Sequence, residues 1–319
     1  MRSVLGLETI YMHTVAVVLE KPECLSLKAL PLIPQGADDV IVNVDYSAIS
    51  SGTERLLWQG KMPSFPGMGY PLVPGYETVG RVAQTSKDFA EGDMVFVPGA
   101  NCYGEVRGLF GGAAKTIATP ASRLIKIDEH LGEDATLLAL AATAHHAIIV
   151  GDVPELIIGH GIVGRLIARI ATALGGSPTI WEAQESRRDS QSGYSVIDPT
   201  TDTHKSYARV CDASGDPAII NFILPHLAKQ GVITLAGFYH DPVNFNFPPA
   251  FMREANIRIA AEWKRSDMDT VLQLIATGKL NLNGLITHHA DAATATDAYA
   301  TAFTNPHCLK MVLDWRQLQ

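Results

Sequence analysis

The chain has 319 residues, about twice the length of a typical domain, so we expect two domains. Apolar residues make up 47% of the chain and charged residues 18%, a globular balance that argues against a disordered or fibrous protein. The net charge is −8 and there is no long basic run, which argues against a nucleic-acid partner.

Cysteine usage and the absence of a leader pattern indicate the compartment. The four cysteines, at positions 24, 102, 211 and 308, stand far apart, which argues against a disulfide framework and favours a reducing setting. Residues 1–11 lack a continuous apolar core and do not resemble a signal peptide. The most apolar stretch, Leu137–Val150, falls short of the roughly 20 residues of a membrane span. We expect a soluble, cytoplasmic protein without a transmembrane segment, with contact to a membrane surface left open.

The first part of the chain, residues 12–127, has a residue pattern typical of a β domain. Short apolar runs are separated by frequent Pro and Gly, and Val40, Val42, Val44 and Tyr46 alternate with polar residues. Alternation of this kind is typical of half-buried strands, and Pro and Gly mark turns. This half therefore predicts an antiparallel, barrel-like domain.

Residues 128–262 alternate between strand and helix patterns. An Ala- and Leu-rich helix is predicted at Leu137–Ile149, a buried strand at Leu156–Ile158, and an amphipathic helix from Val163 to Leu174. Further strands are predicted at Thr179–Trp181, Arg209–Cys211, Val232–Ala236 and Ile257–Ala260. The alternation indicates an α/β domain with a doubly wound parallel sheet.

The tail, residues 263–319, changes pattern again. It predicts helices at Asp267–Thr277 and Ala292–Phe303 and a last strand within Cys308–Trp315. We expect this segment to return to the first domain.

The strongest local motif is the glycine-rich turn GHGIVG. Gly159, Gly161 and Gly164 stand between the strand at Leu156–Ile158 and an amphipathic helix that begins with Ile162 and Val163. In this context the glycines allow a tight turn, close approach of a pyrophosphate and close helix–strand packing, while the helix N-terminus attracts phosphate. The motif predicts dinucleotide binding; a glycine turn without a ligand is the alternative.

An acidic residue follows at the expected offset. Glu182 lies 21 positions after Gly161, at the end of the strand Thr179–Trp181. A carboxylate there accepts hydrogen bonds from a ribose diol and repels a 2′-phosphate, so NAD is the predicted cofactor. Arg187 and Arg188 lie nearby and leave NADP open, since arginine pairs with phosphate; the alternative is a solvated loop.

These motifs together resemble the medium-chain dehydrogenase/reductase superfamily. Pro74–Val82 (PGYETVGRV) and Glu91–Val95 (EGDMV) are similar to its β-domain signatures, and Cys211–Gly215, Gly231–Gly237 and the tail follow its motif order. The resemblance implies a GroES-like β-barrel domain beside a Rossmann domain, and a homodimer. It also places Thr143, Gly237 and Phe238 beside a nicotinamide and Lys310 at the pyrophosphate.

The chain departs from the zinc-containing members. Tyr76 stands in place of a zinc-binding histidine, Ser50 or Ser51 in place of a cysteine, and Ala139 near the third ligand. Serine and tyrosine are poor zinc ligands, and Cys102 stands alone in the region of the structural zinc. No metal is therefore predicted, although a site built from other residues such as His145 and His146 stays open.

A narrower resemblance concerns the substrate. Segments that include SGTERLLW, PSFPGMGYPLVPG, RGLFGGAA and PPAFMREA resemble the branch that dehydrogenates bacteriochlorophyllides. That resemblance alone implies a chlorin substrate, whose secondary alcohol is oxidised with NAD as acceptor.

The candidate catalytic residues are hydroxyl and imidazole groups. Without a metal, hydrogen-bond donors must stabilise the developing alkoxide, and Tyr76, Ser50 and Ser51 are the candidates, each with a packing or turn role as alternative. His146 is a candidate base, or else a buried structural histidine like its neighbour His145. An aromatic wall for the macrocycle is proposed from the following residues, any of which is otherwise core: Trp58, Phe65, Tyr70, Phe110, Phe247 and Phe251.

Three functions remain open from the sequence. The first is the NAD-dependent alcohol dehydrogenase, favoured by Glu182. The second is a zinc-independent, NADPH-dependent quinone or enone reductase. The third is a catalytically silent nucleotide-binding protein.

Overall fold

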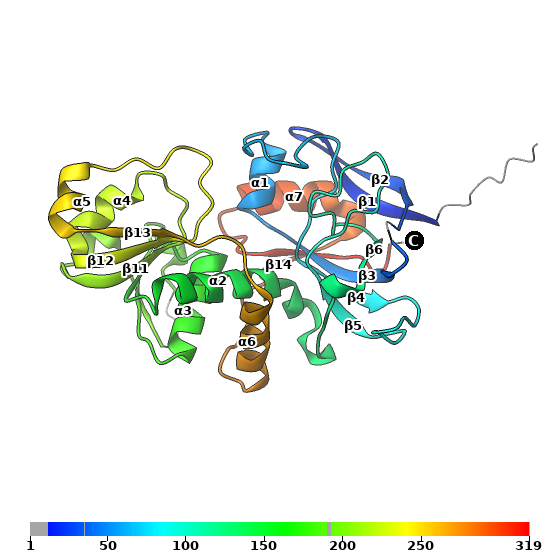
Figure 1. Ribbon diagram of the computed structural model, residues 1–319. Helices are drawn as coiled ribbons and strands as arrows, with labels where there is room; N and C mark the ends of the chain where they lie inside the picture. The colour runs from blue at the N-terminus through cyan, green and yellow to red at the C-terminus, as the bar shows by residue number, and fades with distance from the viewer. Residues whose placement is uncertain (1–11, 35, 190–192, 319) are drawn as a thin grey trace, which may run out of the picture. The chain divides into compact units, whose positions relative to one another are not determined.

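The computed structural model describes residues 12–34, 36–189 and 193–318. The chain forms two compact units: one from the described part of residues 1–136 with 289–304 and 311–319, the other from residues 137–288 and 305–310 (Figure 1). Each is described by itself. Residues 1–11, on which the expectation about a signal peptide rests, lie outside the described residues.

The first unit is built on antiparallel strands. β1 and β2 pair with each other, and a larger sheet has the order β14-β15-β3-β4-β5-β7, with β6 paired to β3. The strands of this unit are β1 (Met12–Lys21), β2 (Cys24–Leu32), β3 (Asp39–Ile49), β4 (Thr78–Val82), β5 (Met94–Val97), β6 (Thr116–Pro120), β7 (Ile125–Lys126), β14 (His288–Asp291) and β15 (Met311–Asp314).

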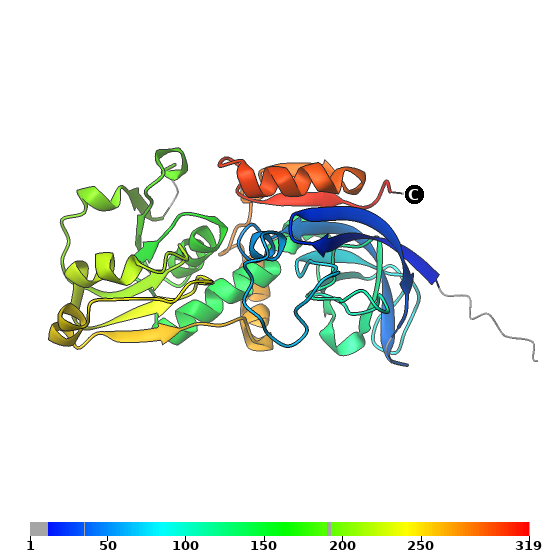
Figure 2. The same cartoon turned by 90° about the horizontal axis from the view of Figure 1, so that it is seen from above.

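The predicted alternation holds only in part of β3. Val40, Val42 and Val44 are buried and Asn43 is exposed, but Ile41 is also buried, and Tyr46, after a register shift in the pairing with β4, is half-buried. Two helices complete the unit, α1 (Thr53–Trp58) and α7 (Ala295–Thr304). Helix α7 packs along β15, as Figure 2 shows.

The second unit is a doubly wound α/β domain. Its six strands are all parallel, in the order β10-β9-β8-β11-β12-β13, so the order reverses direction beside β8. The strands are β8 (Leu156–Ile158), β9 (Thr179–Trp181), β10 (Ser195–Ile197), β11 (Tyr207–Asp212), β12 (Leu227–Leu235) and β13 (Asn256–Ile259); the helices are α2 (Leu138–Gly151), α3 (Ile162–Ala173), α4 (Ile219–Ile223), α5 (Phe247–Arg253) and α6 (Arg265–Ala276). In such a sheet, ligands bind at the carboxyl ends of the strands beside the reversal.

The division of the chain differs from the expected boundaries at 127/128 and 262/263. Helix α6 packs against α2 within the second unit, so residues 263–288 belong there rather than with the first unit. Residues 289–304 and 311–319 do group with the first unit, and residues 305–310 with the second. The helix pattern of α6 predicted an element but not its packing partner.

One helical stretch of the described chain, Glu129–Gly151, is long and apolar enough to span a membrane. It is 78% buried inside the protein. A core helix of a globular fold passes the same test, so this stretch carries little weight as a membrane signal.

Candidate functional site

The glycine-rich turn joins β8 to α3 and has the geometry of a phosphate-binding turn. Gly159 has a φ of +91°, which favours glycine, and a Cβ at Gly164 would lie 1.9 Å from the carbonyl oxygen of Gly159. A Cβ at Gly161 would meet no atom within 4 Å, so the space above that residue is open. Gly161 is the N-cap of α3 and no side chain caps the helix. The turn therefore offers backbone N–H groups to a pyrophosphate.

Glu182 lies at this turn. Its side chain is buried, and its two carboxylate oxygens accept hydrogen bonds from the backbone N–H groups of His160 and Gln184, each at 2.8 Å. The carboxylate is thus fixed between the glycine turn and the end of β9. This is the position from which an acid reaches the ribose diol of a dinucleotide.

The histidine inside the glycine motif has a role that the sequence analysis missed. His160 is fully buried; its Nδ1 lies 2.6 Å from the carbonyl oxygen of Arg187 and its Nε2 lies 3.2 Å from the hydroxyl of Tyr194. Burial, which outweighs the bond to Arg187, lowers the pKa of His160. The ring is therefore neutral, with Nδ1 donating to the carbonyl and Nε2 accepting from Tyr194. It ties the loop after β9 to the glycine turn.

The two arginines of that loop both have protein partners. Arg188 forms an ion pair with Asp198 and donates to the carbonyl oxygen of Glu182 at 3.4 Å. Arg187 donates to the carbonyl oxygen of Pro306 at 3.3 Å. Both arginines are thus half-exposed loop residues with a protein partner, and a role toward a phosphate stays a prediction.

Asp212 organises the neighbouring strand ends. It is fully buried at the end of β11, and its carboxylate accepts hydrogen bonds from the hydroxyls of Ser214, at 2.7 Å, and Tyr239. Burial raises the pKa of Asp212. Gly237 and Phe238 follow β12 directly before Tyr239, and Phe238 is 53% exposed. Asp212 thus joins two turns at the carboxyl edge of the sheet, one of which carries the predicted nicotinamide contacts.

Thr143 and Lys310, the other predicted cofactor residues, also belong to the second unit. Thr143 lies on α2 and donates to the carbonyl oxygen of Ala139 at 3.0 Å. Lys310 is buried, and its carbonyl oxygen accepts from the backbone N–H groups of Thr287 and His288, each at 3.1 Å. Their roles toward a cofactor stay predictions.

His145 and His146 face the same carboxylate. The Nδ1 atoms of the two rings lie 2.8 Å and 3.0 Å from the two oxygens of Asp267 on α6, and all three side chains are buried. Asp267 also accepts from the backbone N–H of Lys264 at 2.8 Å. This arrangement gives both histidines a structural partner, and the role of His146 as a base stays a prediction.

The first unit brings together Tyr76 and Ser50. Their hydroxyl oxygens lie 2.7 Å apart, and the Tyr76 hydroxyl also bonds the side chain of Thr53. Burial, followed by the nearby charge of Glu77, raises the pKa of Tyr76 well above its ordinary value. Ser51 lies in the turn before α1. The phenol therefore keeps its proton at neutral pH and acts as a hydrogen-bond donor rather than a base.

Two buried acids lie behind this hydroxyl group. Glu77 and Glu54 are fully buried, and burial, followed by the nearby charge of Glu54, raises the pKa of Tyr299 on α7. The sequence analysis did not single out Glu54 or Tyr299. Glu54 could have been noticed as the acidic residue within the segment SGTERLLW. This set of side chains does not suit a zinc ion, because Ser50 and Tyr76 offer hydroxyl groups where zinc prefers thiolate and imidazole. Within the described residues, no cluster of three or more His, Cys, Asp or Glu side chains has metal-binding geometry.

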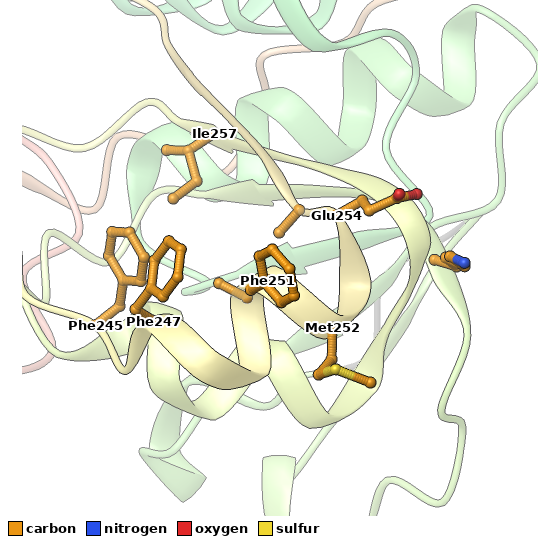
Figure 3. Close-up of a pocket in the computed structure, with 9 residues that line it drawn as sticks. Phe245, Phe247, Phe251, Met252, Glu254 and Ile257 are labelled. Carbon is orange, nitrogen blue, oxygen red and sulfur yellow. The ribbon is translucent and has the colours of Figure 1, made fainter.

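The proposed aromatic wall separates into groups. Trp58 packs against Phe303 with ring centroids 5.6 Å apart, and Tyr76 against Phe110 at 5.1 Å, both in the first unit. Phe247 and Phe251 stack at 5.8 Å on α5 of the second unit. These two line a shallow pocket of about 410 Å³ beside β13 (Figure 3). The wall as one continuous surface stays a prediction.

Comparison with known proteins decides the family. Residues 36–129 match the model of the alcohol dehydrogenase GroES-like domain. The chain is 51% identical over 315 residues to a protein of Cereibacter sphaeroides, with 96% of this chain and 99% of that protein covered. The chain belongs to the medium-chain dehydrogenase family. The Cereibacter protein is named 2-desacetyl-2-hydroxyethyl bacteriochlorophyllide A dehydrogenase, and so is a Rhodobacter capsulatus protein that is 50% identical over the same shares of both chains.

Solved structures show the same medium-chain dehydrogenase fold. An alcohol dehydrogenase from Escherichia coli CFT073, complexed with NADH, has a TM-score of 0.81 at 21% identity, covering 95% of this chain and 99% of that one. A zinc-binding dehydrogenase from Sinorhizobium meliloti, bound to NADP, has a TM-score of 0.79 at 18% identity with the same coverage. The Rossmann and GroES-like domains are thereby confirmed.

Proposed function

We propose that this protein is an NAD-dependent alcohol dehydrogenase that oxidises the 3-(1-hydroxyethyl) group of a bacteriochlorophyllide to the 3-acetyl group, a step of bacteriochlorophyll a biosynthesis. The observation that carries the proposal is the half-identical, nearly full-length match to two proteins that bear this name. The glycine turn at β8 and α3 and the buried hydroxyl group around Tyr76 supply the two halves of the chemistry.

Support for NAD over NADP comes from charge at the end of β9. The carboxylate of Glu182 is fixed beside the glycine turn, where it accepts hydrogen bonds from a ribose diol and repels a phosphate. Arg187 and Arg188, the cations of the following loop, are engaged by Pro306 and Asp198. A 2′-phosphate at this position would thus be repelled by Glu182, while Arg187 and Arg188 are already engaged by other partners.

The reaction removes a hydride from the carbinol carbon and a proton from its hydroxyl. Bound NAD supplies the hydride acceptor. We assign to Tyr76, whose pKa is raised by burial, the donation of a hydrogen bond to the substrate oxygen as negative charge develops there. Ser50, 2.7 Å from the Tyr76 hydroxyl, orients that phenol. The proton of the substrate hydroxyl needs a base, and His146 is the proposed acceptor.

Turnover is proposed to need no metal, because the hydroxyl set at Ser50 and Tyr76 does not suit zinc. We expect the activity to survive exhaustive chelation with 1,10-phenanthroline. Stoichiometric zinc whose removal abolishes turnover would contradict this mechanism.

The experiment that tests the function is anaerobic absorbance spectroscopy with the hydroxyethyl pigment and NAD. A shift of the long-wavelength pigment band together with NADH formation supports the proposal. Reduction of quinones by NADPH without pigment oxidation points to the reductase alternative, and nucleotide binding with no turnover points to the silent one.

The protein is further proposed to act as a homodimer in the reducing cytoplasm, where its four free cysteines stay reduced. β13 ends the second sheet with four exposed residues, of which Ile259 is 74% exposed. Phe247 on α5 is 67% exposed (Figure 3). A second copy covering this edge would bury them. Sedimentation equilibrium tests the dimer.

A further inference from the structure

The ion pair between Arg188 and Asp198 joins two segments at the adenosine side of the glycine turn. Arg188 follows β9 by a few residues, and Asp198 ends β10, the neighbouring parallel strand. The side chains are 21% and 34% exposed, so the pair is partly shielded from water. It is therefore more persistent than a fully exposed surface pair.

Arg188 lies close to the residue that would hold the ribose. Its Nη1 atom donates to Asp198 and also lies 3.4 Å from the carbonyl oxygen of Glu182. The fold thus places a guanidinium at the backbone of the residue whose side chain is fixed at the glycine turn. Arginine in such a place is a good partner for a 2′-phosphate, because it presents several N–H donors and a permanent charge.

The two oxygens of Asp198 have separate tasks. Oδ1 accepts from the backbone N–H of Thr200 at 2.9 Å and from its hydroxyl at 2.6 Å, which caps the short helix Pro199–Thr201. Oδ2 accepts from Arg188. The hydroxyl and N–H of Thr200, followed by Arg188, lower the pKa of Asp198, so the carboxylate is ionised at neutral pH.

We propose that Asp198 is a second determinant of cofactor choice: it holds Arg188 against β10 and thereby keeps a phosphate-binding cation from serving the 2′ position. The inference rests on the proposed preference for NAD. Glu182 acts on the ribose directly, whereas Asp198 acts through Arg188 and is a positioning residue. Arg188 is thus a cation that could bind the 2′-phosphate of NADP, but it already forms an ion pair with Asp198.

The test is the affinity for adenosine 2′,5′-diphosphate and for ADP, measured by isothermal titration calorimetry without turnover. Asp198→Asn keeps an oxygen that caps the helix at Thr200 and removes the charge that holds Arg188. We expect it to bind adenosine 2′,5′-diphosphate about tenfold more tightly, as one new charge-assisted hydrogen bond would give, with the ADP affinity unchanged.

Two controls make the cause specific. Glu185→Gln removes the same charge from an exposed residue of the same loop and should leave both affinities unchanged. Adding Arg188→Ala to Asp198→Asn should abolish the gain. A gain that survives the loss of Arg188, or an unchanged affinity of Asp198→Asn for adenosine 2′,5′-diphosphate, overturns the inference.

Folding of the variants is checked by circular dichroism. Should Asp198→Asn not fold, Asp198→Ser, whose hydroxyl also caps a helix, repeats the measurement with the same criteria. A wild-type protein that prefers NADP would refute the proposed cofactor, whereas an unaltered Asp198→Asn variant refutes only this inference. The two failures are therefore distinguishable.

Discussion

Tyr76 combines a donor hydroxyl with a site that keeps it protonated. Its oxygen lies 2.7 Å from that of Ser50, and burial raises its pKa. We predict that Tyr76→Phe lowers kcat by about 10²–10³, the usual cost of losing a donor to a developing oxyanion. The NAD affinity should stay unchanged, because the cofactor motifs belong to the other unit. Steady-state kinetics and NAD titration check this; full activity of the variant would reduce Tyr76 to a packing residue and make His146 the next residue to test.

Glu182 is the residue proposed to select the cofactor, as Tyr76 is the residue proposed to act on the substrate. Its carboxylate is held by the N–H groups of His160 and Gln184, so it is ordered before any ligand binds. We predict that Glu182→Ala weakens NAD binding by about 1.5–3 kcal/mol, the value of a hydrogen bond to a charged group, and weakens NADP binding less. Fluorescence titration with both nucleotides measures this, with Glu185→Ala, an exposed neighbour, as the control. Equal losses for both nucleotides would contradict the assignment.

Among single residues, the sequence predicted those that belong to a motif. It missed those whose role depends on a side-chain partner from another part of the chain. Gly159, Gly161 and Glu182 follow from spacing along the chain. His160 and Asp198 do not, because their partners, Tyr194 and Arg188, are brought to them by the loop between neighbouring strands.

Among the elements, α2 and α6 are joined by one carboxylate. Asp267 accepts from both His145 and His146, and although burial alone would raise its pKa, the bonds from Lys264 and the histidines lower it. An aspartate whose pKa is lowered in the folded state stabilises the fold above its unfolded pKa, about 3.9, and this contribution is lost as the pH falls through the lower folded value.

We therefore predict that Asp267→Asn lowers the free energy of unfolding by about 2 kcal/mol at pH 7 and changes it much less near pH 2. Urea denaturation at the two pH values measures the difference. Asp269→Asn, on the same helix but with an exposed side chain, is the control and should cost no more than about 0.5 kcal/mol. An effect of Asp267→Asn that does not depend on pH would contradict the link.

The elements that the sequence predicted best have a continuous apolar run. β8 and β9 begin and end at the predicted residues, because short, largely apolar runs bounded by turns are typical of buried parallel strands. β10 and β14 were missed: Ser195–Ile197 lies at the edge of the sheet with exposed and half-buried residues, and His288–Asp291 (HHAD) has no apolar face. Helix α5 was missed because two prolines open it and nearly all its residues are exposed.

For the whole molecule, the two units share the chain in a discontinuous way. The last strand, β15, pairs with β3 of the first unit, with Val312 opposite Ala48. Trp315 follows it, fully buried, and its indole N–H donates to the hydroxyl of Ser47 at 2.8 Å. Residues near the end of the chain are thus part of the core formed by its beginning.

We predict that Trp315→Ala lowers the free energy of unfolding by about 3–5 kcal/mol, the usual cost of emptying a buried aromatic site. Thermal and urea denaturation measure it. Arg316→Ala, the exposed neighbour, should change stability by less than about 1 kcal/mol. A Trp315→Ala protein as stable as the wild type would show that the end of the chain is dispensable.

The neutral ring of His160 has a consequence for how a nucleotide is captured. Because it bonds the carbonyl of Arg187 and the hydroxyl of Tyr194, these two residues are held to the glycine turn when the protein folds, not when a ligand arrives. Preorganisation of this kind lowers the entropic cost of association. Small fragments such as AMP should therefore bind with measurable affinity. The order of the glycine turn does not depend on the nicotinamide half of the dinucleotide.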